Sequence, residues 1–101
     1  MSDAVTSHGL AHCEKPERYI KQLVSHWGHQ YATTYDEGDG MGCFPFSETE
    51  SAVMTARPDG IAIALTTGSA ERNEHMRGVI ERHIDRFAFR EAPLSYEWTD
   101  Q

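Results

Sequence analysis

Residues 69–87 read SAERNEHMRGVIERHIDRF, and this stretch decides the fold class. Ser69 is a good N-cap, because its hydroxyl can accept a hydrogen bond from a free backbone N–H of the first turn. An apolar stripe at three- and four-residue spacing follows it, made of Met76, Val79, Ile80, Ile84 and Phe87. Charged residues occupy the opposite side. The pattern predicts an amphipathic helix from Ala70 to about Phe87, and Pro93 prevents any continuation.

Upstream, between residues 29 and 67, the hydrophobic period changes from that of a helix to that of a strand. Four short runs alternate: Tyr31-Thr33-Tyr35, Phe44-Phe46, Val53-Thr55 and Ile61-Ile63-Leu65. Polar, turn-like clusters separate them at residues 37–40, 47–50 and 57–60. Alternation between short turns is typical of antiparallel strands. The segment predicts a four-stranded antiparallel meander, in which Pro45 must end a strand, form a bulge or lie at an edge because it cannot donate to a neighbour.

The turn at residues 57–60 sets the predicted register of the last two strands. A three-residue loop over 58–60, closed by a bulge at Gly60, pairs Thr55 with Ile63 and Val53 with Leu65. The bulky residues then share one face of the sheet. The other face carries Ala52, Met54, Ala56, Ala62 and Ala64. Because this small-residue face is too apolar to be left wholly wet, we expect it to be a dimer interface or a shallow groove for a planar ligand.

A further helix is predicted to begin near Pro16, which suits a first turn, and to end at Gly28. Its apolar stripe consists of Tyr19, Ile20, Leu23, Val24 and Trp27. The lead-in, residues 1–14, is expected to lie loose or to form an edge strand. Leu94, Tyr96 and Trp98 alternate as a short final strand. These elements predict an α+β two-layer sandwich, a four-stranded antiparallel meander with an N-terminal and a C-terminal helix on one face.

Length and composition exclude several classes of protein. The chain has 101 residues, enough for one core, and a net charge of −7. An acidic balance disfavours a protein that grips nucleic-acid phosphates. No apolar run approaches the ~20 residues that span a bilayer, no signal peptide is recognisable, and the two cysteines are too few for a disulfide framework. We expect a single cytoplasmic domain over residues 1–101, with no nucleic-acid or membrane partner.

Six histidines are the unusual feature of the composition. His83 falls within the apolar stripe of the second helix, where an imidazole loses water and one ring nitrogen needs a partner such as a backbone carbonyl. His26 and His29 lie at the end of the first helix. Neutral imidazole is a natural ligand for transition metals and for haem iron. Two interpretations stay open: ordinary core and surface histidines, or a metal or haem site formed by His26, His29 and His83.

Two further groups of residues could carry chemistry. Arg82, Arg86 and Arg90 lie four residues apart along one helix flank, so either neighbouring acids offset them or they bind an anion. Cys43 could join a metal site or act as a nucleophile with a histidine, although a strand cysteine beside phenylalanines is usually inert core. The sequence holds no phosphate-binding loop, dinucleotide fingerprint, serine elbow or Cys-x-x-Cys pair. No catalytic residue is assigned.

Three separated stretches resemble one known family, the bacterial domain-of-unknown-function family 2218. Residues 18–23, RYIKQL, running on to His26-Trp27, are similar to its opening helix. Cys43-Phe44-Pro45-Phe46 looks like its central strand, and residues 83–91, HIDRFAFRE, followed by Trp98, look like its closing segment. The resemblance covers roughly residues 16–98. The family pattern starts close to the first helix, so the lead-in with His8, His12 and Cys13 departs from it.

The resemblance implies a small cytoplasmic bacterial domain with no established catalytic residues and with histidines at the positions of His26 and His83. It also implies an association with flavin-dependent siderophore-interacting reductases, and hence an accessory role in iron acquisition. The leading hypothesis is a non-enzymatic binding or accessory domain linked to iron or siderophore handling, whose ligand is held by His26, His83 and Arg86. The alternatives are a metal- or haem-binding protein that uses His26, His29 and His83, and a homodimeric interaction module.

Overall fold

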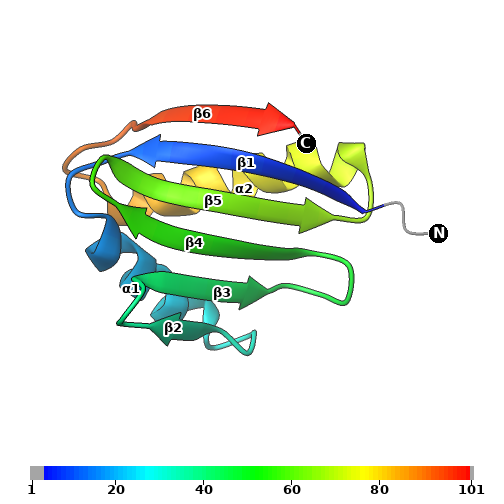
Figure 1. The fold of residues 1–101 in the computed structure, drawn as a ribbon, viewed down its shortest axis with the longest axis horizontal. Helices are drawn as coiled ribbons and strands as arrows, with labels where there is room; N and C mark the ends of the chain where they lie inside the picture. Colours follow the sequence, from blue (N-terminus) through cyan, green and yellow to red (C-terminus); the bar gives the residue numbers. More distant parts are fainter. Residues whose placement is uncertain (1–3, 101) are drawn as a thin grey trace.

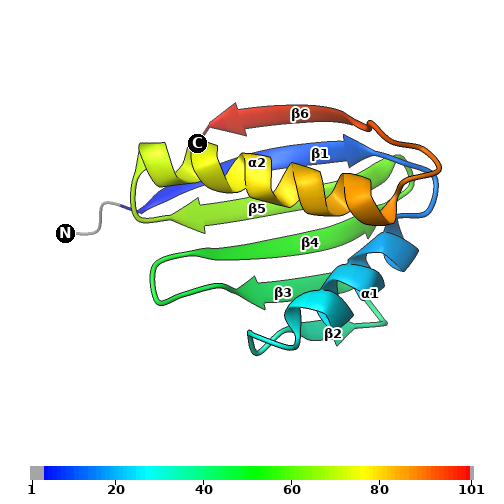
Figure 2. The same cartoon turned by 180° about the vertical axis from the view of Figure 1, so that it is seen from behind.

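The computed structural model describes residues 4–100. Its elements, in chain order, are β1 (Val5–His12), α1 (Pro16–Trp27), β2 (Thr34–Asp36), β3 (Met41–Pro45), β4 (Ser51–Arg57), β5 (Gly60–Thr67), α2 (Ala70–Phe87) and β6 (Ser95–Asp100). The strands form one antiparallel sheet in the order β2-β3-β4-β5-β1-β6 (Figure 1). Both helices lie on the same face of it, α1 across β3 and β4 and α2 along β5 and β1 (Figure 2).

Both helices and the final strand are confirmed. α2 spans the predicted residues, and the Ser69 hydroxyl caps it by accepting a hydrogen bond from the backbone N–H of Arg72 at 3.1 Å. Gly28 follows the last residue of α1. The predicted meander corresponds to β2–β5, and β3 ends at Pro45. Within residues 4–100, neither helix is long and apolar enough to cross a membrane.

The lead-in is where the predicted sheet is wrong, because it supplies a central strand. β1 is neither loose nor at an edge: it pairs with β5 along one side and with β6 along the other, so the sheet has six strands. Residues 1–3 of the lead-in lie outside the described residues. Small residues on the helix side allow the close packing: Ser7 and Ala11 are fully buried, and a Cβ on Gly9 would come within 2.7 Å of the Trp98 ring.

The register predicted for β4 and β5 is wrong by one residue. A two-residue loop, Pro58-Asp59, joins the strands, so that Arg57 pairs with Gly60 and Met54 pairs with Ile63. Gly60 belongs to the ladder rather than to a bulge, since β1 pairs with it from the other side. The approach is so close that a Cβ on Gly60 would lie 2.0 Å from the carbonyl oxygen of Ala11.

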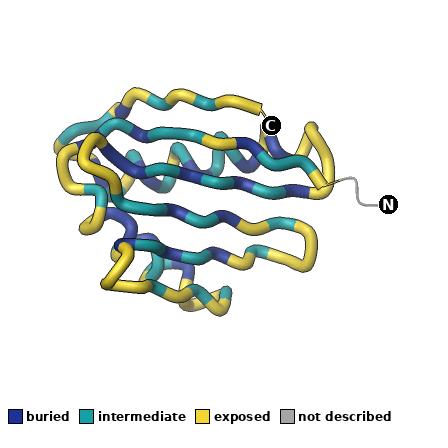
Figure 3. The backbone as a smooth tube through the Cα atoms, viewed as in Figure 1, coloured by how far each residue is buried: buried dark blue, intermediate teal, exposed yellow. Residues whose placement is uncertain are grey.

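This register mixes the two predicted faces of the β4–β5 hairpin. The helix side carries Ala52, Met54, Ala56, Ile61, Ile63 and Leu65. Ala52 and Met54, which we expected on the small-residue face, are therefore buried in the core. The open face, on the side away from the helices, carries half-buried apolar residues: Leu10, Met41, Val53, Ala62 and Ala64. Figure 3 shows this alternation of buried and less buried positions along the strands.

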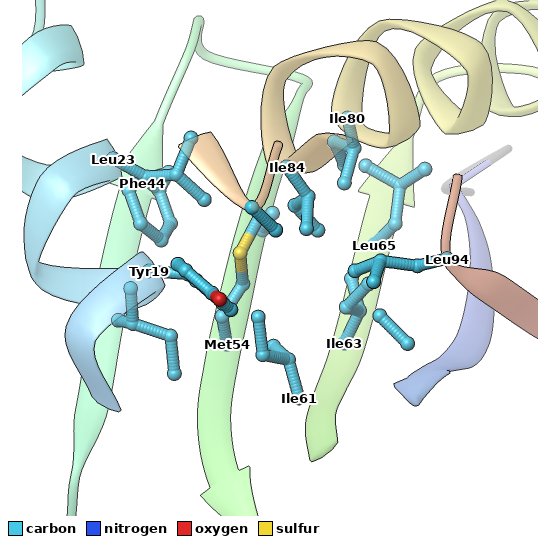
Figure 4. Packing of buried hydrophobic residues seen from close by; sticks show 14 of the residues in the cluster. Tyr19, Leu23, Phe44, Met54, Ile61, Ile63, Leu65, Ile80, Ile84 and Leu94 are labelled. Carbon is cyan, nitrogen blue, oxygen red and sulfur yellow. The ribbon is translucent and has the colours of Figure 1, made fainter. Parts of the chain in front are cut away.

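One cluster of buried side chains joins the sheet to both helices (Figure 4). α1 contributes Tyr19, Ile20, Leu23 and Trp27, and α2 contributes Met76, Ile80 and Ile84. These residues belong to the two apolar stripes that the helical spacing predicts. The stripes cross the sheet side by side, so the residues along their adjoining edges are brought to the junction between the helices.

A buried amide fixes the start of α2 to the sheet. Asn73 is only 1% exposed, and its Oδ1 accepts hydrogen bonds from the Ser7 hydroxyl at 2.7 Å and from Nε of Arg77 at 2.9 Å. Its Nδ2 donates to the backbone carbonyls of Val5 and Leu65. The side chain thus connects α2 with β1 and β5, and it satisfies polar groups that would otherwise be buried without partners.

Candidate functional site

The C-terminal parts of α1 and α2 meet in a cluster of rings. The ring of His26, on α1, lies 5.6 Å from that of His83 and 5.5 Å from that of Phe87, both on α2, measured between centroids. Trp27 lies 4.7 Å from His83 and 5.4 Å from Phe44 of β3, which joins the cluster to the core. The structure therefore brings together His26 and His83, two residues that are far apart in the sequence.

His83 is oriented by its own helix. Its Nδ1–H donates a hydrogen bond of 2.7 Å to the backbone carbonyl of Val79, one turn earlier. Because a carbonyl can only accept, Nδ1 carries the proton, and Nε2 is left to accept a bond from a ligand. The carbonyl partner is the kind that the sequence predicts, but the ring is half-buried rather than enclosed in the core. Its free nitrogen therefore remains open to a ligand.

His26 is held mostly by ring packing. Burial lowers its pKa from the usual value of 6.5, and the neighbouring His83, Arg86 and His29 lower it further because each opposes a second positive charge. The ring is therefore neutral at pH 7 and has one nitrogen with a free lone pair. Two imidazoles, each with a nitrogen that can bind a ligand, are thus in contact at the surface of the junction between α1 and α2.

Glu81 and Asp85, two acids of α2 that could have offset its arginines, are hydrogen-bonded to β6 instead. The Asp85 carboxylate accepts the Tyr96 hydroxyl at 2.7 Å, and the Glu81 carboxylate accepts the Trp98 indole N–H at 2.7 Å. Burial and the Asp85 contact raise the pKa of Tyr96, so that its hydroxyl stays a donor. Glu81 and Asp85 therefore face β6.

Arg86 is consequently a cation without an acidic partner beside the histidine pair. Its guanidinium carbon lies 6.0 Å from the centre of the Phe87 ring, and Phe87 contacts His26. Among residues 4–100, the ion pairs of arginine are those of Arg72 and Arg77, which leaves Arg86 and its neighbours Arg82 and Arg90 unpaired. An unpaired guanidinium next to two imidazoles is suited to an anionic group.

The predicted three-histidine set does not come together as a closed metal site. Within residues 4–100, no three His, Cys, Asp or Glu side chains are arranged so that they could hold a metal ion. His29 is exposed beyond the end of α1. Cys43 lies between two residues of β3 that are buried on the helix side, so it faces away from both histidines. Burial raises the pKa of Cys13 to about 11, which keeps that thiol protonated and a poor ligand.

A second feature, which the sequence does not indicate, lies beside the ring cluster, between the first turns of α1 and the segment after α2. Glu91, just after α2, accepts the Tyr19 hydroxyl at 2.5 Å and the backbone N–H of Glu14 at 2.9 Å. Beside this contact is a pocket of about 270 Å³, and Gln22 lines it. Oε1 of Gln22 is buried without a hydrogen-bond partner. No pattern in the sequence indicates this pocket, because residues 88–91 have no periodicity that would place them against α1.

The chain was compared with known proteins. The sequence model of a family described as "Uncharacterized protein conserved in bacteria (DUF2218)" matches residues 8–99, and so takes in most of β1 as well as the region of the resemblance. The NMR structure of PA4090 from Pseudomonas aeruginosa is similar to this chain with a TM-score of 0.75. The two are 23% identical, over 94% of this chain and 95% of that one, which supports the fold alone. No curated protein matches. With a match over nearly its whole length, the chain belongs to the bacterial family DUF2218.

Proposed function

We propose that this protein is a non-enzymatic binding domain that recognises a small anionic metal chelate through His26, His83 and Arg86. One observation carries the proposal: two imidazoles from different helices are in ring contact beside an unpaired guanidinium. Imidazole nitrogens suit transition metals, including iron, and the guanidinium suits the negative charge of a chelating ligand.

A chelate fits this arrangement better than a bare metal ion. A protein site for a bare ion supplies three or four ligands, and the described part of the chain offers only the two histidines at this junction. In a chelate, most coordination positions are filled by the small molecule, so two imidazoles are enough to complete the metal. The guanidinium then offsets the negative charge of the complex, in a chain whose net charge of −7 otherwise repels it.

Ferric siderophore complexes are the members of this class that the family resemblance favours. A partner follows from the same reasoning: a flavin-dependent reductase that takes the iron from the bound complex. This link to iron rests on the resemblance. The ligand class itself rests on the histidine pair and on Arg86, and it can be tested independently of the biological source of the chelate.

The test uses a ferric bis-catecholate complex, which is anionic and leaves coordination positions open on the metal. We expect its charge-transfer absorption to shift on addition of protein without a histidine tag. A gallium analogue, which is diamagnetic, should shift the amide signals of His26, His83 and Arg86 in NMR spectra. The His26→Gln/His83→Gln variant should bind at least about tenfold more weakly, as expected for the loss of two direct ligands.

The matched control is His75→Gln, which removes an exposed histidine of α2 far along the helix from the pair. It should bind like the parent. Equal binding by the double variant and the parent would refute the assignment of the site.

Metal analysis and a visible spectrum of the purified protein test the alternative, a resident metal or haem held by His26, His29 and His83. Metal or haem that is retained by the parent and lost from the double variant would favour that alternative.

A homodimeric interaction module is a second candidate, and the open face of the sheet favours it. That face carries the half-buried apolar residues Leu10, Met41, Val53, Ala62 and Ala64, with both helices on the other side. If two copies pack through it, sedimentation should detect a dimer that Ala64→Asp dissociates, since a charge there would be buried without a partner. A monomer at high protein concentration would exclude this module.

A further inference from the structure

Hydrogen bonds to Glu91 hold the walls of the pocket at the start of α1 in place. It lies between the first turns of α1 and the segment that follows α2, which meet at the end of the helix pair (Figure 2). Both oxygens of Glu91 are used in closing it, one by the Tyr19 hydroxyl and the other by the Glu14 N–H. Burial and the Glu91 contact raise the pKa of Tyr19 to about 12, so the phenol remains a neutral donor to that carboxylate.

Three cations line this pocket without an acidic partner. Lys15, Arg18 and Arg90 all belong to its wall, and none of them takes part in the ion pairs formed among residues 4–100. Two acids, Glu14 and Glu91, also line the pocket, and the Glu91 carboxylate is already hydrogen-bonded within it. Three cations against two acids leave the pocket wall with net positive charge in a chain of net charge −7, which favours an anionic ligand there.

The wall also contains aromatic rings and one residue with an unsatisfied acceptor. Phe87 and Phe89 line the pocket, and Phe89 is the large apolar side chain that stands out as exposed in the described residues, at 70%. Gln22 contributes the buried Oε1 that has no hydrogen-bond partner. The volume of about 270 Å³ lies just below the roughly 300–1,000 Å³ typical of sites for drug-sized ligands, so a single substituted ring is the appropriate size.

From these three features we infer that the pocket binds a small hydroxylated aromatic carboxylate. The carboxylate meets Arg18 and Arg90, the ring packs against Phe87 and Phe89, and the hydroxyl donates to Oε1 of Gln22. The carboxylate, the ring and the hydroxyl of the ligand therefore each have a counterpart in the pocket wall. The pocket adjoins the histidine pair, since Phe87 lines the pocket and also contacts His26, but its polar residues are different, and the inference does not depend on the proposed function.

The experiment is a titration of the isotopically labelled protein with 3-hydroxybenzoate, followed by NMR. We expect saturable shifts of the amide signals of Lys15, Arg18, Phe89 and Glu91. The Arg18→Gln/Arg90→Gln variant should bind at least about tenfold more weakly, because two charge-assisted contacts are lost. Both side chains are exposed or line the surface, so the variant should fold, and its far-UV circular dichroism checks this.

Arg57→Gln is the matched control, since it removes an exposed arginine at the end of β4, outside the pocket, and should leave the affinity unchanged. Two analogues test the parts of the ligand. 3-Hydroxybenzyl alcohol lacks the carboxylate and should bind at least about tenfold more weakly. Benzoate lacks the hydroxyl and should bind several-fold more weakly in the parent but as well as 3-hydroxybenzoate in Gln22→Leu.

Three results would overturn the inference: no saturable shifts at the pocket, the parent's affinity in the double arginine variant, or equal binding of the uncharged alcohol. The His26→Gln/His83→Gln variant separates this site from the proposed chelate site. It should keep its affinity for 3-hydroxybenzoate. If that affinity is lost, the aromatic acid binds at the histidine pair, and the pocket is not its site.

Discussion

Protonation of His26 opposes folding, because the ring packs against His83 and Phe87 and has Arg86 beside it. The folded chain lowers its pKa below 6.5, so at pH values below 6.5 the unfolded chain binds more protons and the free energy of unfolding falls. We expect stability to decrease as the pH is lowered from about 7.5 to about 5.5, and the decrease to be smaller in His26→Gln. Urea unfolding at each pH measures the difference.

His75→Gln serves as the control for this pH dependence. His75 is exposed on α2 and is not one of the rings that pack against His26, so its removal should leave the contribution of His26 in place. The assignment fails if His26→Gln and the parent lose the same stability over this pH range.

Asn73 is the second residue whose removal should be costly. Its amide holds the Ser7 hydroxyl, the carbonyls of Val5 and Leu65 and the Nε of Arg77, and all but the last of these lie on the sheet. Asn73→Ala leaves buried polar groups without partners, and should lower the free energy of unfolding by about 2–4 kcal/mol.

A double-mutant cycle tests whether these hydrogen bonds cause the loss. Ser7→Ala should cost less in the Asn73→Ala background than in the parent, because the bond between the two residues is already gone. Chemical unfolding of the four proteins at neutral pH gives the coupling energy. Additive losses would show that Asn73 stabilises the chain by some means other than this contact.

Single residues were predictable from sequence to different degrees. His26 and His83 could be singled out because each lies on or beside an apolar stripe, and both stripes must face the same sheet. Asn73 could not, because a polar residue in a helix is ordinarily exposed, and nothing nearby in the sequence reveals its partners on β1 and β5. Gln22 and Glu91 have the same difficulty, since their pocket depends on how the segment after α2 turns back to α1.

At the scale of the elements, the β1–β5 contact determines the register of the sheet. Gly60 pairs with Arg57 on one side and His12 on the other, at φ +153°, and the Ala11 carbonyl oxygen lies where a Cβ would be. Gly60→Ala should therefore force β1 and β5 apart and lower the free energy of unfolding by at least about 2 kcal/mol. Thermal or urea unfolding measures this loss.

Gly68→Ala is the matched control for the same chemical change. Gly68 is exposed after β5, and the nearest atom to an added Cβ is Cβ of Thr49 at 3.7 Å, an ordinary contact. We expect a change within about 0.5 kcal/mol. Comparable effects at the two positions would mean that the close approach of β1 does not constrain Gly60.

The elements themselves were largely predictable, whereas their pairing was not. The helices and the strands of the meander follow from periodicity, because each buries its own apolar side chains. β1 gives a weak signal, since its inward positions are Ser7, Gly9 and Ala11, and the large side chains that cover it come from α2 and Trp98. Side-chain size on two strands alone predicts the wrong register, because it takes no account of β1, the third strand, which pairs with Gly60.

At the scale of the molecule, one core connects everything that positions the two sites. The buried cluster contains side chains from the sheet and both helices. The chain starts inside the sheet at β1, crosses to the edge strand β2, returns inward through β3, β4 and β5, and ends at the other edge with β6. The histidine pair and the aromatic pocket lie next to each other at the helix junction, and Phe87 belongs to both. Their geometry therefore depends on the docking of both helices on the sheet, which local sequence patterns cannot specify.

The two tryptophans test whether residues 1–101 unfold as one domain. Trp27, the last residue of α1, packs against Phe44 and His83. Trp98 lies on the edge strand β6 and donates a hydrogen bond to Glu81. Trp98→Phe leaves Trp27 as the fluorescent probe, and Trp27→Phe leaves Trp98. Because both positions share one core, fluorescence and far-UV circular dichroism should give the same urea midpoint within each variant. An earlier fluorescence change in Trp27→Phe alone would show that β6 separates from the sheet before the core unfolds.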